Sequence, residues 1–503
     1  MTHRRRRART TLPIALAVLL AGGCMPGGSS AQDSSSGSAP RLRVALNFPP
    51  VAGLSPYSDD AVLLTRAGIT ESLVRFDKDG TPQPALAQSF SMVGDRTARF
   101  VLRKGVTFHD GTPMDAQAVA GALTRAISAK PAPETVSGRP LTVKAVGADT
   151  VEVTSARPDP VLVQRLGNPD LAILAPKAYA KDPNRPDPTG AGTGPFRLVG
   201  VTGASEAKAD ANPTYWGGRP RLAGLDIRFI GKADARTAAL RDGQVDVIQN
   251  VPIAQIANVG ADKVVSRPVP RTTGIHLNAA KGAFADPALR VAARAAIDPA
   301  AVATGVFEGQ ADPARGFFRG DTAWAQSRPA PTFPAAGAVN GQRITLATYT
   351  DRPELPEAAT VVADQLRKAG FVVDAPVVKS YTLLERDIAA GTYDAVIGSR
   401  MYLSQAADPL SGLQSDFTCA GTFNQSHLCD RDLDALVAQG SSLPDVAARR
   451  TAALAAEARM LGTAAYVPLV HERVRIGRVA GVTGLSDDPL EWRMVTEQTA
   501  LAR

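Results

Sequence analysis

The chain is poor in the residues that hydrolases and metalloproteins commonly use. It has five histidines and three cysteines in 503 residues. Neither a Gly-x-Ser-x-Gly elbow nor a His-Glu-x-x-His zinc motif occurs in it. We therefore expect no catalytic centre, no metal site and no cofactor, and an exported hydrolase is the weaker alternative.

Positive charge is also scarce outside the N-terminus. The formal net charge is +8, from 56 Lys and Arg against 48 Asp and Glu. Five of these arginines lie at positions 4–7 and 9, and without them the chain has 51 basic and 48 acidic residues, a net charge of +3. No basic stripe with interleaved aromatic residues follows, so we expect no nucleic-acid partner.

No apolar run is long enough for a permanent membrane span. The run Leu12–Leu20 follows the arginines and precedes the small residues Ala21-Gly22-Gly23 and Cys24, which predicts a signal peptide over residues 1–23. These small residues resemble a bacterial lipobox, in which Cys24 would be diacylated, although Ala21 stands where leucine is more usual. The alternative is a plain secretory signal, with Cys24 discarded.

Residues 24–40 are rich in glycine and serine and lack core-forming side chains. We expect a flexible tether, which would hold the folded body at the outer face of the cytoplasmic membrane through the lipid on Cys24.

The other two cysteines, Cys419 and Cys429, flank a short polar segment. Outside the cytoplasm we expect them to form a disulfide that stabilises the fold by roughly 2–3 kcal/mol. The alternative is a metal site that also uses His427, but two sulfurs and one histidine leave its ligand set incomplete.

The segment from residue 99 to residue 120 carries the main sequence pattern of the chain. Residues 99–103 alternate polar and apolar side chains, as in a half-buried strand, and Asp110-Gly111 supplies a turn. Thr112 is expected to cap the following helix, with Pro113 at its first position and Asp115 in its first turn. His109 and Asp110 read as a hydrogen-bonded turn pair, because partners for a metal or catalytic site are absent nearby.

The string from Leu102 to Ala120 resembles the signature of the family 5 extracytoplasmic solute-binding proteins, the peptide/nickel type that delivers ligands to ABC importers. Thr193-Gly194-Pro195-Phe196 resembles the second signature of that family, and Asn212–Pro220 resembles the third. The resemblance implies an α/β, two-lobed periplasmic-binding-protein-like fold of type II, with an additional domain and a hinge between the lobes.

The resemblance also implies where the lobes divide. The expected parts are lobe I over 41–70, 190–271 and 471–503, the additional domain over 71–189, and lobe II over 272–470.

The best candidate ligand contacts follow the predicted strand at residues 393–398, because ligands of open α/β sheets lie beyond the carboxyl ends of strands. Arg400 offers a planar fork for a carboxylate, or else forms a surface or inter-lobe ion pair. We expect Tyr402 either to stack on a ligand or simply to pack against neighbouring side chains. Asp408, before Pro409, binds ligand or has a structural role.

Ser404 departs from the peptide-binding relatives, several of which carry an aspartate at this position to receive a peptide ammonium group. A hydroxyl cannot replace that charge, which puts a free-amine dipeptide in doubt. Tyr57 and Trp324 are further candidate contacts, each with the alternative of simple packing.

We therefore expect a monomeric, membrane-tethered receptor that captures an oligopeptide or peptide-like solute by hinge closure and delivers it to an ABC permease. The alternatives are a binder of a nickel chelate or another anionic molecule, and a receptor that signals without transport.

Overall fold

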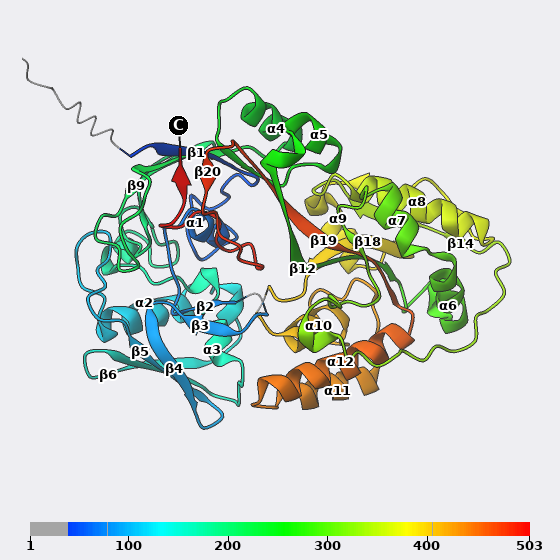
Figure 1. Cartoon of the computed structure of the whole chain (residues 1–503). Helices are drawn as coiled ribbons and strands as arrows, with labels where there is room; N and C mark the ends of the chain where they lie inside the picture. The colour runs from blue at the N-terminus through cyan, green and yellow to red at the C-terminus, as the bar shows by residue number, and fades with distance from the viewer. Residues whose placement is uncertain (1–38, 78, 405, 503) are drawn as a thin grey trace, which may run out of the picture. The chain divides into compact units, whose positions relative to one another are not determined.

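Two long antiparallel strands, β12 (Val264–Leu277) and β19 (Tyr466–Arg478), run side by side through the middle of the fold (Figure 1). They belong to an eleven-stranded sheet with the main order β17-β15-β18-β12-β19-β11-β1-β10-β9-β8. The computed structural model describes residues 39–77, 79–404 and 406–502. The predicted signal peptide, Cys24 and nearly all of the tether lie outside these residues.

One half of the sheet, which we call lobe I, is built around β1 (Arg41–Leu46). This strand is parallel to β10 (Gly224–Phe229) and to β11 (Val247–Gln249). Strands β9 (Glu206–Ala211) and β8 (Phe196–Thr202) extend it by antiparallel pairing.

The other half, lobe II, is built around β18 (Ala395–Met401), which pairs antiparallel with β12 and parallel with β15 (Leu346–Tyr349). Strand β17 (Val377–Lys379) completes this edge. The amphipathic helix α8 (Leu355–Lys368) packs its buried residues, among them Val362 and Leu366, into the core of this lobe. The sequence pattern predicts a strand at residues 344–348, a helix at 356–369 and a strand at 371–374. Strand β15, helix α8 and strand β16 (Val372–Val373) confirm this alternation.

A separate four-stranded sheet, in the order β4-β5-β7-β6, forms the additional domain. Its strands are β4 (Ala87–Val93), β5 (Thr97–Leu102), β6 (Leu141–Val146) and β7 (Thr150–Ser155). Helix α2 (Ala116–Ser128) covers one face of this sheet (Figure 1) and buries Val119 and Leu123. The predicted strand and helix around the first signature are therefore confirmed, but the predicted cap is wrong: Asp115, not Thr112, caps α2 by accepting a hydrogen bond from Ala118 N at 2.8 Å.

The remaining elements complete the two lobes and the connections between them. The helices are α1 (Ala61–Arg66), α3 (Leu162–Arg165), α4 (Ala233–Arg241), α5 (Ile256–Val259), α6 (Pro287–Ala296), α7 (Pro299–Gly305), α9 (Tyr381–Ala389), α10 (Pro409–Phe417), α11 (Arg431–Ser441) and α12 (Val446–Gly462). The short strands are β2 (Val74–Phe76), β3 (Pro82–Pro84), β13 (Asp312–Pro313), β14 (Arg343–Ile344), β16 (Val372–Val373), β20 (Val482–Thr483) and β21 (Ala500–Leu501). The pair Asp286-Pro287 predicts a helix start, with Asp286 as the cap and Pro287 at the first position. The structure confirms it, because Asp286 caps α6 by accepting a hydrogen bond from Ala288 N.

The first two signatures meet in space. His109 Nε2 lies 2.9 Å from the carbonyl oxygen of Gly194, and a Cβ on Gly194 would come within 2.3 Å of Gly68 O. Asp110 instead accepts hydrogen bonds from Thr112. His109 and Asp110 therefore do not form the predicted pair, because each is held by a different neighbour. Burial lowers the pKa of His109 to about 4, despite the bond to the carbonyl.

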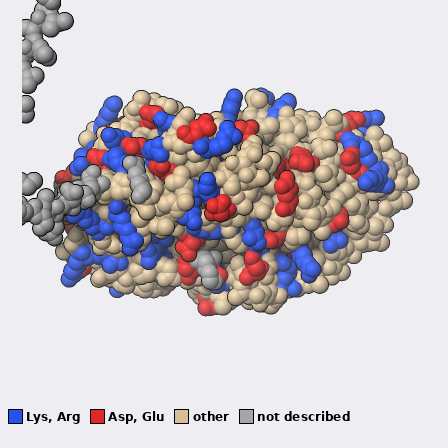
Figure 2. Space-filling view, turned by 45° about the horizontal axis from the view of Figure 1, so that its top comes forward, with Lys and Arg blue, Asp and Glu red and all other residues tan. Residues whose placement is uncertain are grey.

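Charge does not single out a binding surface on the face drawn in Figure 2, where basic and acidic side chains are interspersed. Among the residues that the structure describes, no helix has both the length and the apolar character needed to cross a membrane.

Candidate functional site

A cavity of about 320 Å³ lies between the two lobes, beyond the carboxyl ends of their parallel strands. Lobe I contributes residues that follow β1, β10 and β11, and lobe II contributes the segment after β15. The lining residues at these strand ends are Asn47, Phe48, Gly231, Lys232, Asn250, Thr350, Asp351 and Arg352. We call this space the interlobe cavity.

The long strands supply the back wall of the interlobe cavity. Between Pro268 and Thr272 the pairing of β12 with β19 is irregular, and Glu472 alone faces this stretch of β12. Irregular pairing of this kind re-aims side chains. It brings Arg271 and Glu472 into the lining of the same cavity.

Glu472 is a fully engaged carboxylate. It accepts hydrogen bonds from Thr273 Oγ1 at 2.6 Å, from Ser399 Oγ at 2.5 Å and from Arg352 Nη1 at 2.9 Å. Burial alone would raise its pKa, but the charges of Arg352 and Arg271 and these hydrogen bonds lower the pKa of Glu472 to about 2. The carboxylate is therefore ionised and has little capacity left for a ligand.

Arg271 is the opposite case. Its side chain is only 17% exposed, and the nearest carboxylate oxygen, Oε2 of Glu491, is 3.9 Å from Nη2. Its Nε has no hydrogen-bond partner among the described residues. Burial, followed by the nearby charge of Arg352, lowers the pKa of Arg271 to about 10, so it stays protonated at neutral pH. Burying a cation costs free energy when no carboxylate lies within hydrogen-bond distance of it. An anionic ligand group that binds Arg271 would offset that cost.

The charged side chains of the cavity lining, Arg271 and Glu472 included, have an excess of two positive charges. Six side chains are basic and four are acidic. Arg236 is engaged by the backbone, because its guanidinium donates hydrogen bonds to the carbonyl oxygens of Gln249, Ile230 and Gly231. Arg475 pairs with Glu354 at 2.6 Å. Arg473 pairs with Asp312 at 3.0 Å and Arg352 with Glu472 at 2.9 Å, so Arg271 is the arginine of the lining whose guanidinium is least engaged.

Aromatic side chains border this charged wall. Phe48, just after β1, is 49% exposed, whereas Tyr349, at the end of β15, is 8% exposed. The Tyr349 hydroxyl accepts a hydrogen bond from Ser399 N at 2.8 Å, which fixes its ring beside Glu472. The cavity thus offers a fixed aromatic surface from lobe II and an accessible one from lobe I.

Arg400, the leading candidate from the sequence, forms a largely buried ion pair within lobe II, not the surface or inter-lobe pair that was its alternative. Its Nε and Nη2 atoms bind the two carboxylate oxygens of Asp416 at 2.8 and 2.9 Å, and its guanidinium stacks on Phe423 at 3.8 Å. Asp416 is 1% exposed. The planar fork predicted for a ligand is therefore occupied by a neighbouring side chain.

Tyr402 and Asp408 have structural contacts. The Tyr402 ring is 2% exposed and packs on Phe317 and Phe318, with centroids 5.6 and 5.2 Å away. Asp408 caps α10 and pairs with Arg449 at 2.8 Å. Packing and capping, the second of the two roles considered for each residue, are what the structure contains.

The remaining predicted contacts also lie outside the interlobe cavity. Ser404 accepts a hydrogen bond through its carbonyl oxygen from Asn168 Nδ2 at 3.3 Å. Trp324 packs against Phe318, and Tyr57 lies beside Tyr179, with ring centroids 5.3 and 6.5 Å apart. None of the six predicted ligand contacts lines the cavity.

The Cys419 and Cys429 sulfurs are joined in a disulfide. His427 Nε2 lies 3.0 Å from the carbonyl oxygen of Ile388, so backbone engages the ring that a metal site would need. Within the described ranges, no group of three or more His, Cys, Asp or Glu side chains could hold a metal ion.

Sequence reasoning missed Arg271, Arg352 and Glu472. The rule that pointed to residues after the predicted strand 393–398 applies equally to the predicted strand at 344–348, and would have pointed to Arg352. No comparable signal marks Arg271, because its position depends on the irregular pairing of two strands about 200 residues apart.

The comparisons agree with this two-lobed arrangement. The family model described as bacterial extracellular solute-binding proteins, family 5 Middle, matches residues 81–424. The Fe(III)-EDTA complex of NikA from Brucella suis superposes with a TM-score of 0.78 at 22% identity, covering 92% of this chain and 100% of that one.

Two curated relatives cover most of the chain. The probable D,D-dipeptide-binding periplasmic protein DdpA of Escherichia coli K12 is 23% identical over 84% of this chain and 86% of its own length. The glutathione-binding protein GsiB of Shigella dysenteriae is 25% identical, over 86% and 89%. The chain belongs to the family 5 bacterial extracellular solute-binding proteins, which bind solutes for transport and are not enzymes.

Proposed function

We propose that this protein captures an oligopeptide or peptide-like solute in the interlobe cavity and delivers it to the membrane subunits of an ABC importer. The observation that carries the proposal is the buried guanidinium of Arg271, which lines a cavity between two lobes, has an Nε without a hydrogen-bond partner among the described residues, and lies 3.9 Å from its nearest carboxylate oxygen, on Glu491. The relatives that bind a dipeptide and glutathione support a peptide-like ligand.

The lining suggests how such a ligand is oriented. Its carboxylate is placed against Arg271, with Arg352 beside it, because these guanidinium groups supply planar donors. Asp351 lies in the same lining and is available to an ammonium group. A volume of about 320 Å³ favours a short ligand over a long peptide.

Capture uses hinge closure. The cavity takes Asn47 and Phe48 from lobe I and Tyr349 and Arg352 from lobe II, so a ligand touches both sides only when the lobes are together. We place the hinge where β12 and β19 pass between lobe I (41–70, 190–271 and 471–503) and lobe II (272–470), with the additional domain over 71–189.

We further propose that Cys24 is lipidated and that the monomeric protein is tethered to the outer face of the cytoplasmic membrane. Labelling of host cells with an alkyne fatty acid should mark the wild-type protein and leave a Cys24→Ala variant unmarked. Equal labelling of both would exclude this anchor.

Native mass spectrometry of the protein purified from its host tests the role of Arg271. We expect the wild type to carry an intact carboxylate-bearing solute and Arg271→Gln to lose it, since a hydrogen bond to a charged group contributes about 1.5–3 kcal/mol. Arg431→Gln is the matched control, because that side chain is 82% exposed and pairs weakly with Asp434. Equal occupancy in Arg271→Gln and the wild type would refute the proposed role, and a hydrolysed solute would refute a binding protein.

A metal chelate or another anionic molecule is the second candidate. The excess of two positive charges in the lining suits a polycarboxylate as well as a peptide, and the NikA structure holds Fe(III)-EDTA. The mass of the retained solute distinguishes the two candidates. Deletion of the permease distinguishes transport from signalling, because uptake is lost only if the protein serves an importer.

A further inference from the structure

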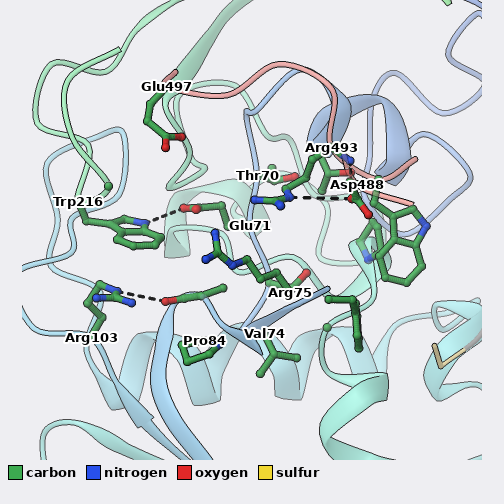
Figure 3. A pocket seen from close by; sticks show the side chains of 18 of the residues that line it. Thr70, Glu71, Val74, Arg75, Pro84, Arg103, Trp216, Asp488, Arg493 and Glu497 are labelled. Atoms are coloured by element: carbon green, nitrogen blue, oxygen red, sulfur yellow. Dashed lines mark hydrogen bonds and ion pairs between the residues drawn. The ribbon is translucent and has the colours of Figure 1, made fainter. Parts of the chain in front are cut away.

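A second cavity, of about 270 Å³, lies beside Glu71 (Figure 3). Its walls come from the loop after α1, from β2 and β3, from the third signature around Trp216, and from the C-terminal segment 488–497. No lining residue lies in the lobe II segment 272–470. This cavity, which we call the Glu71 cavity, is therefore complete without contact between the lobes.

One wall of the Glu71 cavity is apolar. Val74, Phe76, Pro84 and Trp492 line it, and the Phe76 and Trp492 rings meet edge to face with their centroids 5.6 Å apart. Such a surface suits an aromatic or branched aliphatic body.

Two of the acidic groups in this cavity are already satisfied. Glu71 accepts hydrogen bonds from Thr193 Oγ1 at 2.9 Å, Tyr215 Oη at 2.8 Å and Trp216 Nε1 at 3.0 Å. Asp488 accepts hydrogen bonds from Leu490 N at 3.0 Å and Arg493 N at 2.9 Å. Their oxygens have little capacity left for a ligand donor.

The basic groups are less engaged. Arg103 is held by Ala85 O at 3.2 Å and stacks on Trp216 at 4.2 Å. Arg493 Nε reaches Asp488 only at 3.9 Å, and the guanidinium of Arg75 has no hydrogen bond or ion pair within the described part of the chain. Figure 3 shows Arg75 and Arg493 extending into the same space beside Glu71. Arg75 is an exposed residue, so its donors are open to solvent and to an acceptor group on a ligand.

From this arrangement we infer a second ligand site, which binds a small organic carboxylate with an aromatic or branched aliphatic body. The carboxylate lies between Arg75 and Arg493, and the body lies on Phe76, Val74 and Trp492. Glu497, at the upper rim in Figure 3, disfavours a second negative charge on the ligand. The inference does not rest on the proposed function, because none of its residues belongs to the interlobe cavity.

Calorimetry with phenylacetate, and with phenylacetamide as its neutral counterpart, tests this site. We expect phenylacetate to bind and phenylacetamide to bind at least tenfold more weakly. Arg75→Gln should weaken phenylacetate at least tenfold and Arg493→Gln about threefold or more. Arg157→Gln is the matched control, because Arg157 is an exposed arginine on the same domain, and it should bind as the wild type does. Arg271→Gln should also leave the affinity unchanged, which separates this site from the interlobe cavity.

Tryptophan fluorescence locates the binding. The chain has three tryptophans, and Trp216 and Trp492 line the Glu71 cavity whereas Trp324 does not. Phenylacetate should change the emission of a Trp324→Phe variant as much as that of the wild type. Absence of binding at millimolar phenylacetate, equal affinity for the amide, or full affinity in folded Arg75→Gln would each overturn the inference.

Discussion

Arg271 and Arg400 stand on neighbouring strands, β12 and β18, where their positions differ by one residue of register. Both are largely buried, but Arg400 is held by two oxygens of Asp416, whereas the nearest carboxylate oxygen to Arg271 is 3.9 Å away. Arg400 is thus fully paired within lobe II, whereas Arg271 has only the longer contact with Glu491. From this contrast we propose Arg271, and not Arg400, as the arginine that binds an anionic ligand group.

The largest expected effect comes from breaking the Arg400 pair. Asp416→Ala leaves a largely buried guanidinium without its anion, which we expect to lower the free energy of unfolding by about 3 kcal/mol. Urea denaturation followed by circular dichroism measures it. The double variant Arg400→Met/Asp416→Leu should recover much of the loss, and equal stability of Asp416→Ala and the wild type would contradict this account of Arg400.

The disulfide closes a loop that contacts Arg400. The loop between Cys419 and Cys429 carries Phe423, which stacks on Arg400. Cys419→Ser/Cys429→Ser should lower the free energy of unfolding by about 2–3 kcal/mol, because the cross-link restricts a loop with a sequence separation of 10 in the unfolded chain. Ligand affinity at the interlobe cavity should stay within about threefold. A large loss of affinity in the folded variant would tie the loop to the binding site.

The third prediction concerns how the free energy of unfolding depends on pH through Glu472. The pKa of Glu472 is about 2 in the folded protein, below its ordinary value of 4.5. Its contribution to stability is therefore fully present above pH 4.5 and is lost as the pH falls toward 2. Glu472→Gln should show a smaller decline of unfolding free energy between pH 4.5 and 2.5 than the wild type. Identical declines would show that Arg352 and Arg271 do not depress this pKa.

The smallest effect concerns a contact between lobe II and the additional domain. Arg450 Nη2 donates to the carbonyl oxygen of Asp79 at 2.6 Å, so lobe II is bonded to the additional domain at this point. Arg450→Ala should weaken the closed form by about 1 kcal/mol, about fivefold in affinity, through faster ligand release. Stopped-flow release measures it, with Arg431→Gln as the control. An unchanged release rate would remove this contact from the closure mechanism.

Periodicity and caps could be predicted from the sequence because they are local. The alternation at residues 99–103 became β5, and Asp286-Pro287 became the start of α6. Thr112 was the wrong cap, since Asp115 stands closer to the first buried turn and its carboxylate accepts from Ala118 N.

The candidate site was harder to predict because its determinants are distant in sequence. Tyr402 is buried by Phe317 and Phe318, some 85 residues earlier. Arg271 reaches the cavity only through the irregular pairing of β12 with β19. The strand-end rule was applied to a strand predicted to end at residue 398, but β18 continues to Met401. Arg400 therefore lies within the strand, where its guanidinium pairs with Asp416.

A double-mutant cycle between the protein and its ligand tests the central claim most directly. The solute recovered from the host is compared with its carboxamide analogue, each binding to the wild type and to Arg271→Met, by calorimetry. We predict a coupling free energy of about 1.5–3 kcal/mol between Arg271 and the ligand carboxylate. A coupling near zero, with both ligands losing the same affinity on substitution, would contradict the assignment of Arg271 as the group that receives the carboxylate.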